Sequence, residues 1–238
     1  MWRRCCLILL AAAGPAAAVA PLTMVVDTSA VMPEARIQGS RVLAGLHADL
    51  GAALAQQLGR PVQMRALPRK RIARALESGE ADLVCDYQSA WLPGPFAWSR
   101  GFIPDQTVLV TAAQTPAPPR LAAVAGRTVG TVLGYAYPEA AQALGAGLVR
   151  DDAPDAVANL RKLELGRVQH VLSGRRLLDY RRRAAGFALP LHPPLVVAEV
   201  LGQCGLSPRS TLTLTALNAA IDRLVAEGEL ARILGKYR

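Results

Sequence analysis

Short apolar runs alternate with amphipathic stretches along the first half of the chain. The apolar run 22–27 ends in a polar residue, which is typical of a buried strand that opens into a cleft. Leucines recur every four residues over 46–58, and this spacing predicts an amphipathic helix. Residues 61–66 and 81–85 predict two further strands, and Pro68 begins a helix between them. This alternation predicts an α/β fold with parallel sheets covered by helices.

The same alternation of predicted strands and helices starts again after a proline-rich segment. Residues 112–119 read as an extended linker, because proline runs exclude helix and sheet, and we place a domain boundary there. Residues 127–132 then predict a strand, Gly134 a turn and Pro138 a helix start. Such a turn can leave backbone N–H groups free for a polar or anionic ligand group, or it can be an ordinary strand-to-helix connection.

The N-terminus has the order of a secretory signal peptide. Arg3 and Arg4 precede a short apolar run, and small residues follow, with cleavage expected after Ala18. Later apolar runs are too interrupted to span a membrane. The sequence therefore predicts a signal peptide over 1–18 and a periplasmic mature protein.

Removal of that segment lowers the number of cysteines and the net charge of the chain. Only Cys85 and Cys204 remain, and in an exported protein they form either a disulfide or two buried free thiols. The formal net charge falls from +9 to +7 with the loss of Arg3 and Arg4. Nucleic acid is not an expected partner, because the protein is exported, poor in aromatic residues, and has its basic residues scattered among acidic ones.

Candidate ligand contacts gather where parallel strands end. This rule brings together Asp27, Tyr87 and the start of the helix after Pro68. Arg69 and Arg71 begin that helix, where positive charge opposes the helix dipole, so we expect them to reach an anionic ligand group. The alternative is that they are solvated or paired with Glu77 and Glu80. We interpret His47 as a surface or capping residue and expect no metal site and no cofactor, since the histidine spacing does not suit ligation.

Several segments in order resemble the periplasmic solute-binding proteins of ABC importers, in the amino-acid-type family (bacterial extracellular solute-binding protein family 3). The resemblance covers nearly the whole mature chain and rests on the strand ending in Asp27 and on the segments 45–59, 76–83, 98–102, 121–130 and 217–228. It implies a two-lobed periplasmic binding protein-like fold of type II, in which each lobe is a mixed, mainly parallel sheet flanked by helices and two hinge strands join the lobes. Residues 19–111 would begin the first lobe, 112–200 would form the second, and 201–238 would return to the first as its C-terminal helices.

The same resemblance implies a function and a set of contacts. The protein would be a monomer that is not an enzyme, capture a small polar, possibly anionic solute between its lobes, and deliver it to a membrane ABC permease. It also implies a Cys85–Cys204 disulfide, because the returning strand would lie beside the strand that ends near Cys85. The expected ligand-binding residues are Asp27, Arg69, Arg71, Tyr87, Trp91, Gly134, Tyr135 and Tyr137.

Three departures from the family pattern concern the ligand. No arginine precedes Trp98-Ser99, where the family usually has a carboxylate-binding Arg. Tyr135 follows Gly134 in place of the usual threonine, and the usual aspartate that receives an amino group is replaced near Ser173-Gly174. These differences predict a ligand other than an ordinary α-amino acid. They leave open a dehydratase-like enzyme that would use Asp27, Glu34 or Asp86, and a sensory or partner-binding module.

Overall fold

The first lobe is built around β1 (Leu22–Asp27), the apolar run that the sequence predicts as the first strand. β1 pairs in parallel with β4 (Val62–Leu67) and with β5 (Leu83–Tyr87). Helices α1 (Leu46–Leu58) and α2 (Arg69–Ser78) connect these strands. The sequence prediction of this strand and helix order is confirmed.

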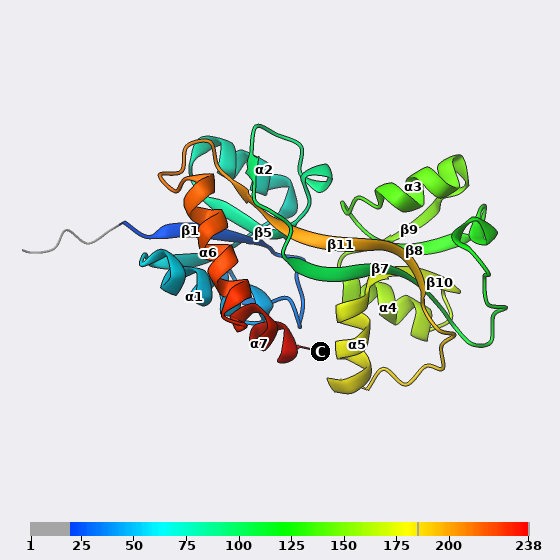
Figure 1. Ribbon diagram of the computed structural model, residues 1–238. Helices are drawn as coiled ribbons and strands as arrows, with labels where there is room; N and C mark the ends of the chain where they lie inside the picture. Colours follow the sequence, from blue (N-terminus) through cyan, green and yellow to red (C-terminus); the bar gives the residue numbers. More distant parts are fainter. Residues whose placement is uncertain (1–19, 185, 238) are drawn as a thin grey trace, which may run out of the picture.

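Helices cover both faces of this sheet. α1 packs with α6 (Leu214–Ala226) and α7 (Glu229–Gly235) around a core that includes the fully buried leucines of α1. α2 packs on the other face with a smaller core around Ile72 and Leu76. The C-terminal segment therefore completes the lobe that the N-terminal segment begins, as Figure 1 shows. A small hairpin, β2 (Arg36–Gln38) and β3 (Arg41–Ala44), precedes α1.

The second lobe repeats the arrangement around β8 (Thr128–Val132). β8 pairs in parallel with β9 (Val149–Ala153) and β10 (His170–Gly174). Its helices are α3 (Pro138–Leu144), α4 (Ala156–Glu164) and α5 (Arg175–Ala184). Single 3₁₀ turns lie at Ser89–Trp91 (η1), Leu121–Val124 (η2) and Gly145–Gly147 (η3).

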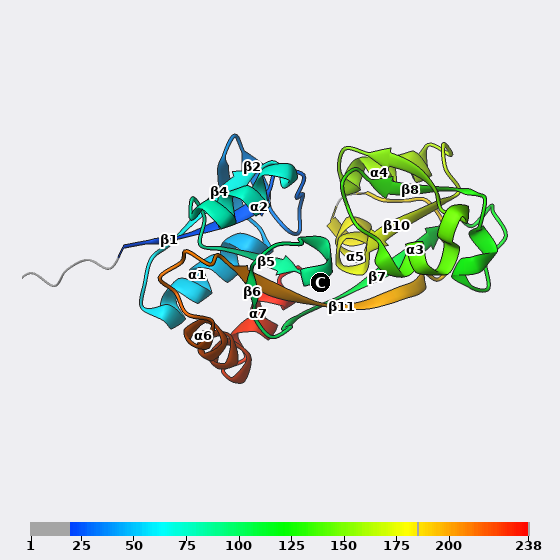
Figure 2. The same cartoon turned by 90° about the horizontal axis from the view of Figure 1, so that it is seen from above.

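Two long antiparallel strands join the lobes. β7 (Ile103–Thr111) and β11 (Leu195–Leu206) pair along most of their length and run from one lobe to the other in both views (Figures 1 and 2). β11 also pairs with β5 and with the short β6 (Ala97–Trp98), while β7 pairs with β10. The order β4-β1-β5-β11-β7-β10-β8-β9 is thus one twisted sheet that passes through both lobes.

The computed structural model describes residues 20–184 and 186–237. The predicted signal peptide, residues 1–18, lies outside the described residues. Within the described part of the chain, none of the helices is both long and apolar enough to cross a membrane. The chain is a mixed α/β protein of two lobes joined by two strands, as predicted.

Candidate functional site

The carboxyl ends of the first-lobe strands place three polar side chains together. Asp27 ends β1 and is 5% exposed, and Tyr87 ends β5. Arg69 begins α2 directly after β4. Its Nη1 donates to Asp27 Oδ2 and to Tyr87 Oη, each over 3.2 Å. The strand ends therefore form a polar group of opposite charges, because parallel strands open their carboxyl ends at the same edge of the sheet.

This group explains how α2 tolerates a basic first turn. The first turn of α2 contains no acidic residue to balance the helix dipole. Asp27 supplies the missing negative charge from the neighbouring strand. Burial would lower the pKa of Arg69, but Tyr87, Tyr135 and Asp27 raise it, so the guanidinium stays charged. Burial also raises the pKa of Tyr87 well above its usual value, which keeps its phenol neutral.

Aromatic residues of the second lobe face Arg69 from across the cleft. The Arg69 guanidinium carbon lies 4.4 Å from the centre of the Tyr135 ring and 5.2 Å from the centre of the Tyr87 ring. These distances are typical of cation–π contacts, which gain strength when water is excluded. Tyr135 and Tyr137 lie close to each other, with ring centres 6.5 Å apart. Arg69 of the first lobe thus contacts Tyr135 of the second lobe.

The glycine turn after β8 is held by bonds within the protein. Gly134 has a φ of 75°, a conformation that favours glycine. The N–H of Val132 donates to Tyr137 Oη over 3.1 Å, and the N–H of Tyr135 donates to the Val132 carbonyl over 3.1 Å. The N–H of Leu133 donates to the Ala153 carbonyl over 2.9 Å. These three N–H groups are therefore not free for an anion, which favours the alternative of an ordinary strand-to-helix connection.

A second charged group lies deeper between the lobes and centres on Arg176, in the first turn of α5. Its Nε and Nη2 donate to the two carboxylate oxygens of Glu34 over 2.8 and 3.2 Å. Nη2 also donates to Asp86 Oδ2 over 2.6 Å, and Nη1 donates to the Pro104 carbonyl over 3.3 Å. The backbone N–H of Arg176 donates to Asp105 Oδ1 over 3.0 Å. One buried guanidinium of the second lobe thus binds carboxylates of the first lobe and of β7.

Three carboxyl groups surround one guanidinium, so ionisation of all three together is unfavourable. Burial raises the pKa of Glu34 to about 8; Arg176 opposes this shift and Asp86 adds to it. Burial likewise raises the pKa of Asp105. Burial lowers the pKa of His47, so its imidazole is neutral. Glu34, His47 and Asp86 each place a potential metal-ligating atom within 4.8 Å of the others.

Both charged groups line one cavity of about 180 Å³ between the lobes. Most of the sequence-predicted contacts line it, namely Asp27, Arg69, Tyr87, Trp91, Tyr135 and Tyr137. Gly134 is not one of the residues that line the cavity, and an added Cβ there would stand 3.6 Å from Arg69 Cδ. Trp91 packs edge-on against Tyr87, with ring centres 6.4 Å apart. The structure therefore brings these residues of both lobes to a single cavity.

Two expectations need correction. Arg71 is exposed and does not line the cavity, because two residues along a helix correspond to a turn of about 200° and place it on the opposite side from Arg69. His47 is 7% exposed and lines the cavity, so it is not a surface residue. It continues the buried face of α1 through Gly51 and Leu54, at the i, i+4, i+7 spacing that could have revealed it.

Among the acidic and arginine residues that line the cavity, four were not predicted ligand contacts: Glu34, Asp86, Asp105 and Arg176. Glu34 was expected only as a candidate group for an enzyme, whereas the strand-end rule also places Asp86 at the opening. Arg176 belongs to a strongly basic helix, α5, whose last turn carries three further arginines. A signal was present in the sequence, because Arg176 precedes the apolar pair Leu177 and Leu178, and all three are buried.

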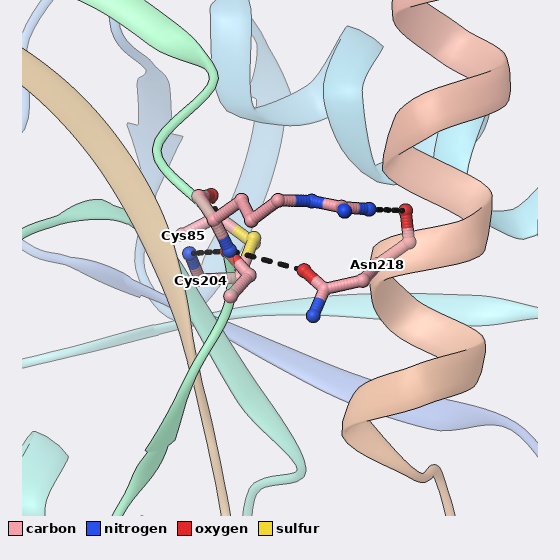
Figure 3. The surroundings of a disulfide bond; sticks show 5 residues. Cys85, Cys204 and Asn218 are labelled. Carbon is pink, nitrogen blue, oxygen red and sulfur yellow. Dashed lines mark hydrogen bonds between the residues drawn. A yellow bond between two sulfur atoms is a disulfide. The ribbon is translucent and has the colours of Figure 1, made fainter.

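Cys85 and Cys204 form a disulfide, 119 residues apart in the chain. They lie on the paired strands β5 and β11, with Cα atoms 4.0 Å apart. Figure 3 shows this bond beside Asn218 of α6, whose Oδ1 accepts the N–H of Arg100 over 3.0 Å. The bond joins the first-lobe sheet to the returning strand β11, at the residue of β5 that precedes Asp86.

Comparisons with known proteins agree with this architecture. The family model described as bacterial extracellular solute-binding proteins, family 3, matches residues 22–238. A search of curated proteins finds no significant match.

Solved structures of low sequence identity share the fold. An ancestral arginine-binding protein bound to arginine is 19% identical, with a TM-score of 0.74 over 91% of this chain and 97% of that chain. The periplasmic VFT2 domain of Bordetella pertussis BvgS is 20% identical, with a TM-score of 0.72 over 92% and 93%. The ancestral amino acid-binding protein AncCDT-1, a precursor of cyclohexadienyl dehydratase, is 15% identical, with a TM-score of 0.73 over 91% and 94%.

The family match extends from the first strand to the end of the chain, and these solved structures share the chain's overall fold. The chain belongs to the bacterial extracellular solute-binding proteins of family 3.

Proposed function

We propose that the protein captures a small polar solute in the cavity between its lobes, in the periplasm, and presents it as a monomer to the membrane permease of an ABC importer. In this proposal residues 19–111 and 201–238 form the first lobe and residues 112–200 the second. The observation that carries the proposal is the contact of Arg69 with Tyr135, which brings the two lobes together over a polar cavity. Ligand contacts to both lobes would stabilise this closed arrangement.

The charges of the cavity favour a neutral, zwitterionic or cationic solute over an anion. Four carboxyl groups line the cavity, from Asp27, Glu34, Asp86 and Asp105. Two arginines face them, and each arginine is already paired with these carboxyl groups. An anion would have to displace such a pair and approach the remaining carboxylates, which costs free energy in a site of low dielectric. We therefore propose a neutral, zwitterionic or cationic solute in place of the anionic ligand that the sequence suggested.

Aromatic rings give the proposed solute an apolar contact surface. Tyr87, Trp91 and Tyr135 present ring faces or edges to the cavity. A cavity of about 180 Å³ suits a molecule of metabolite size after a modest opening of the lobes. The proposed contacts are Asp27 and Arg69 for polar groups, and the three aromatic residues for stacking.

A ligand screen tests the proposal. The exported protein would be unfolded and refolded to remove bound solutes, then heated with pooled amino acids, polyamines and small organic acids. We expect one pool to raise the melting temperature, and calorimetry with its active component to show binding without consumption. Absence of binding to any pool would favour the sensory or partner-binding alternative.

One observation favours an enzyme as the second candidate. Burial raises the pKa of Glu34 to about 8, and a carboxyl group that is protonated near neutral pH can act as a general acid. Incubation of the bound solute with the protein, followed by mass spectrometry, separates the two functions. Conversion that stops in a Glu34→Gln variant would support the enzyme, and an unchanged solute would support the binding protein.

A further inference from the structure

Three side chains of the first lobe gather metal-ligating atoms at one place in the cavity. Glu34 lies in the loop before β2, His47 in the first turn of α1, and Asp86 next to the end of β5. One donor atom from each lies within 4.8 Å of the other two. All three residues precede β7, so they stay together when one lobe moves relative to the other.

His47 supplies an independent indication of a missing partner. The residue is 7% exposed, and its Nδ1 is buried without a hydrogen-bond partner. A buried polar nitrogen without a partner costs free energy, and native proteins rarely leave one without a reason. Coordination of a metal ion would give the imidazole a partner at this position.

A protein cation already binds the same carboxylates. The Arg176 guanidinium donates to both carboxylate oxygens of Glu34 and to Asp86 Oδ2. Arg176 comes from α5 of the second lobe, whereas its carboxylate partners belong to the first. A divalent ion and this guanidinium cannot share the carboxylates, because the two positive charges would lie within a few ångströms of each other.

We propose that Glu34, His47 and Asp86 form a binding site for a divalent transition-metal ion such as Zn²⁺, and that the Arg176 guanidinium occupies this site when the lobes are closed. One imidazole and two carboxylates suit Zn²⁺ better than Mg²⁺ or Ca²⁺, which prefer oxygen ligands alone. Zinc bonds of about 2.0–2.2 Å in a tetrahedral arrangement place two ligand atoms about 3.3–3.6 Å apart, so donors that lie within 4.8 Å of one another would move inward by about 1–1.5 Å.

The competition has a direct consequence for the lobes. Metal binding requires Arg176 to withdraw with the second lobe, so the metal ion stabilises an open arrangement. The closed arrangement restores the Arg176 pairs and excludes the ion. This inference does not depend on the identity of the solute that the cavity captures.

Zinc chloride titrated into the metal-free exported protein tests the site by calorimetry. We expect one zinc ion per chain, and no heat from magnesium chloride. His47→Gln should weaken zinc binding at least tenfold, because it removes the imidazole. Arg176→Gln should tighten zinc binding at least tenfold, because it removes the competing cation. His192→Gln is the matched control and should bind as the wild type does, since His192 lies outside the cavity and contacts the Thr115 carbonyl.

Two results would overturn the proposal. One is a His47→Gln variant that binds zinc as tightly as the wild type, and the other is an Arg176→Gln variant with no gain in affinity. Thermal unfolding followed by circular dichroism checks that each variant folds. If either variant fails to fold, the other decides the outcome. Small-angle scattering adds a readout of conformation: zinc should raise the radius of gyration of the wild type, and an unchanged radius would contradict the coupling.

Discussion

Arg69 and Arg71 begin the same helix but have different surroundings. Arg69 contacts Asp27, Tyr87 and Tyr135 inside the cavity, whereas Arg71 is exposed. We predict that Arg69→Ala weakens solute binding at least tenfold, or about 1.4 kcal/mol, because Asp27 loses its buried partner. Arg71→Ala is the matched control and should change the affinity less than about twofold. Calorimetry with the solute from the screen measures both, and equal losses would refute this assignment.

His170 predicts a pH dependence of stability. Its side chain is 1% exposed, its Nδ1 lies 2.9 Å from Thr111 Oγ1, and burial lowers its pKa from the usual 6.5. The unfolded chain therefore binds a proton more readily than the folded protein. The stabilisation is complete above about pH 6.5 and is lost as the pH falls below it.

Urea unfolding at about pH 7.5 and about pH 5.5 checks this prediction. The free energy of unfolding should fall between the two pH values, and it should fall less in a His170→Gln variant, which cannot titrate. Equal falls in the wild type and in the variant would show that His170 stays accessible to protons in the folded state.

Residues at strand ends could be predicted from the sequence, whereas of the cavity residues at helix starts only Arg69 was expected there. Asp27 and Tyr87 end apolar runs, and the strand-end rule placed them correctly at the cavity; Tyr135 was expected there from the family resemblance. The side chains of His47 and Arg176 lie in the first turns of helices. Their direction depends on the angle at which each helix leaves the sheet, and the sequence pattern does not specify this angle.

At the scale of elements, the disulfide between β5 and β11 ties the two ends of the first lobe together. It closes a segment of 119 residues that includes the entire second lobe. We predict that a Cys85→Ala, Cys204→Ala double variant loses about 2–5 kcal/mol of unfolding free energy, since the crosslink restricts the unfolded chain. Chemical denaturation measures this loss. Dithiothreitol should destabilise the wild type and leave the double variant unchanged, and the opposite pattern would contradict the prediction.

Regular elements with strong periodicity were predictable, and those that depend on pairing were not. The leucine spacing of α1 and the apolar run of β1 specify their structures locally. The hairpin β2–β3 has exposed ends and short strands, so its sequence lacks such a signal. β11 extends from Leu195 to Leu206, beyond its apolar part, because β5 and β7 pair with its glycine-containing end.

At the scale of the whole molecule, Arg176 connects the lobes in addition to Arg69. We predict that Arg176→Gln shifts the protein without added ligand or metal toward an open arrangement, because buried carboxylates without a counter-charge favour contact with water. Small-angle scattering should give a larger radius of gyration than for the wild type. Arg182→Gln, an exposed position on the same helix, is the control and should not change it. A radius that Arg176→Gln leaves unchanged would show that other contacts hold the lobes together.

The two-lobed fold was predictable because the alternation of strands and helices is repeated on either side of a proline-rich linker. The ligand class was not, because it depends on how carboxylates and arginines from distant segments pair within the cavity. Glu34, Asp86 and Asp105 come from a loop, a first-lobe strand and a joining strand, and only the fold brings them to one guanidinium.

The most direct test of solute capture is the crystal structure of the protein with the solute identified by the screen. We predict electron density for the solute in the cavity, in contact with Asp27 or Arg69 of the first lobe and with Tyr135 of the second. Density confined to one lobe, or bound outside this cavity, would contradict capture by lobe closure.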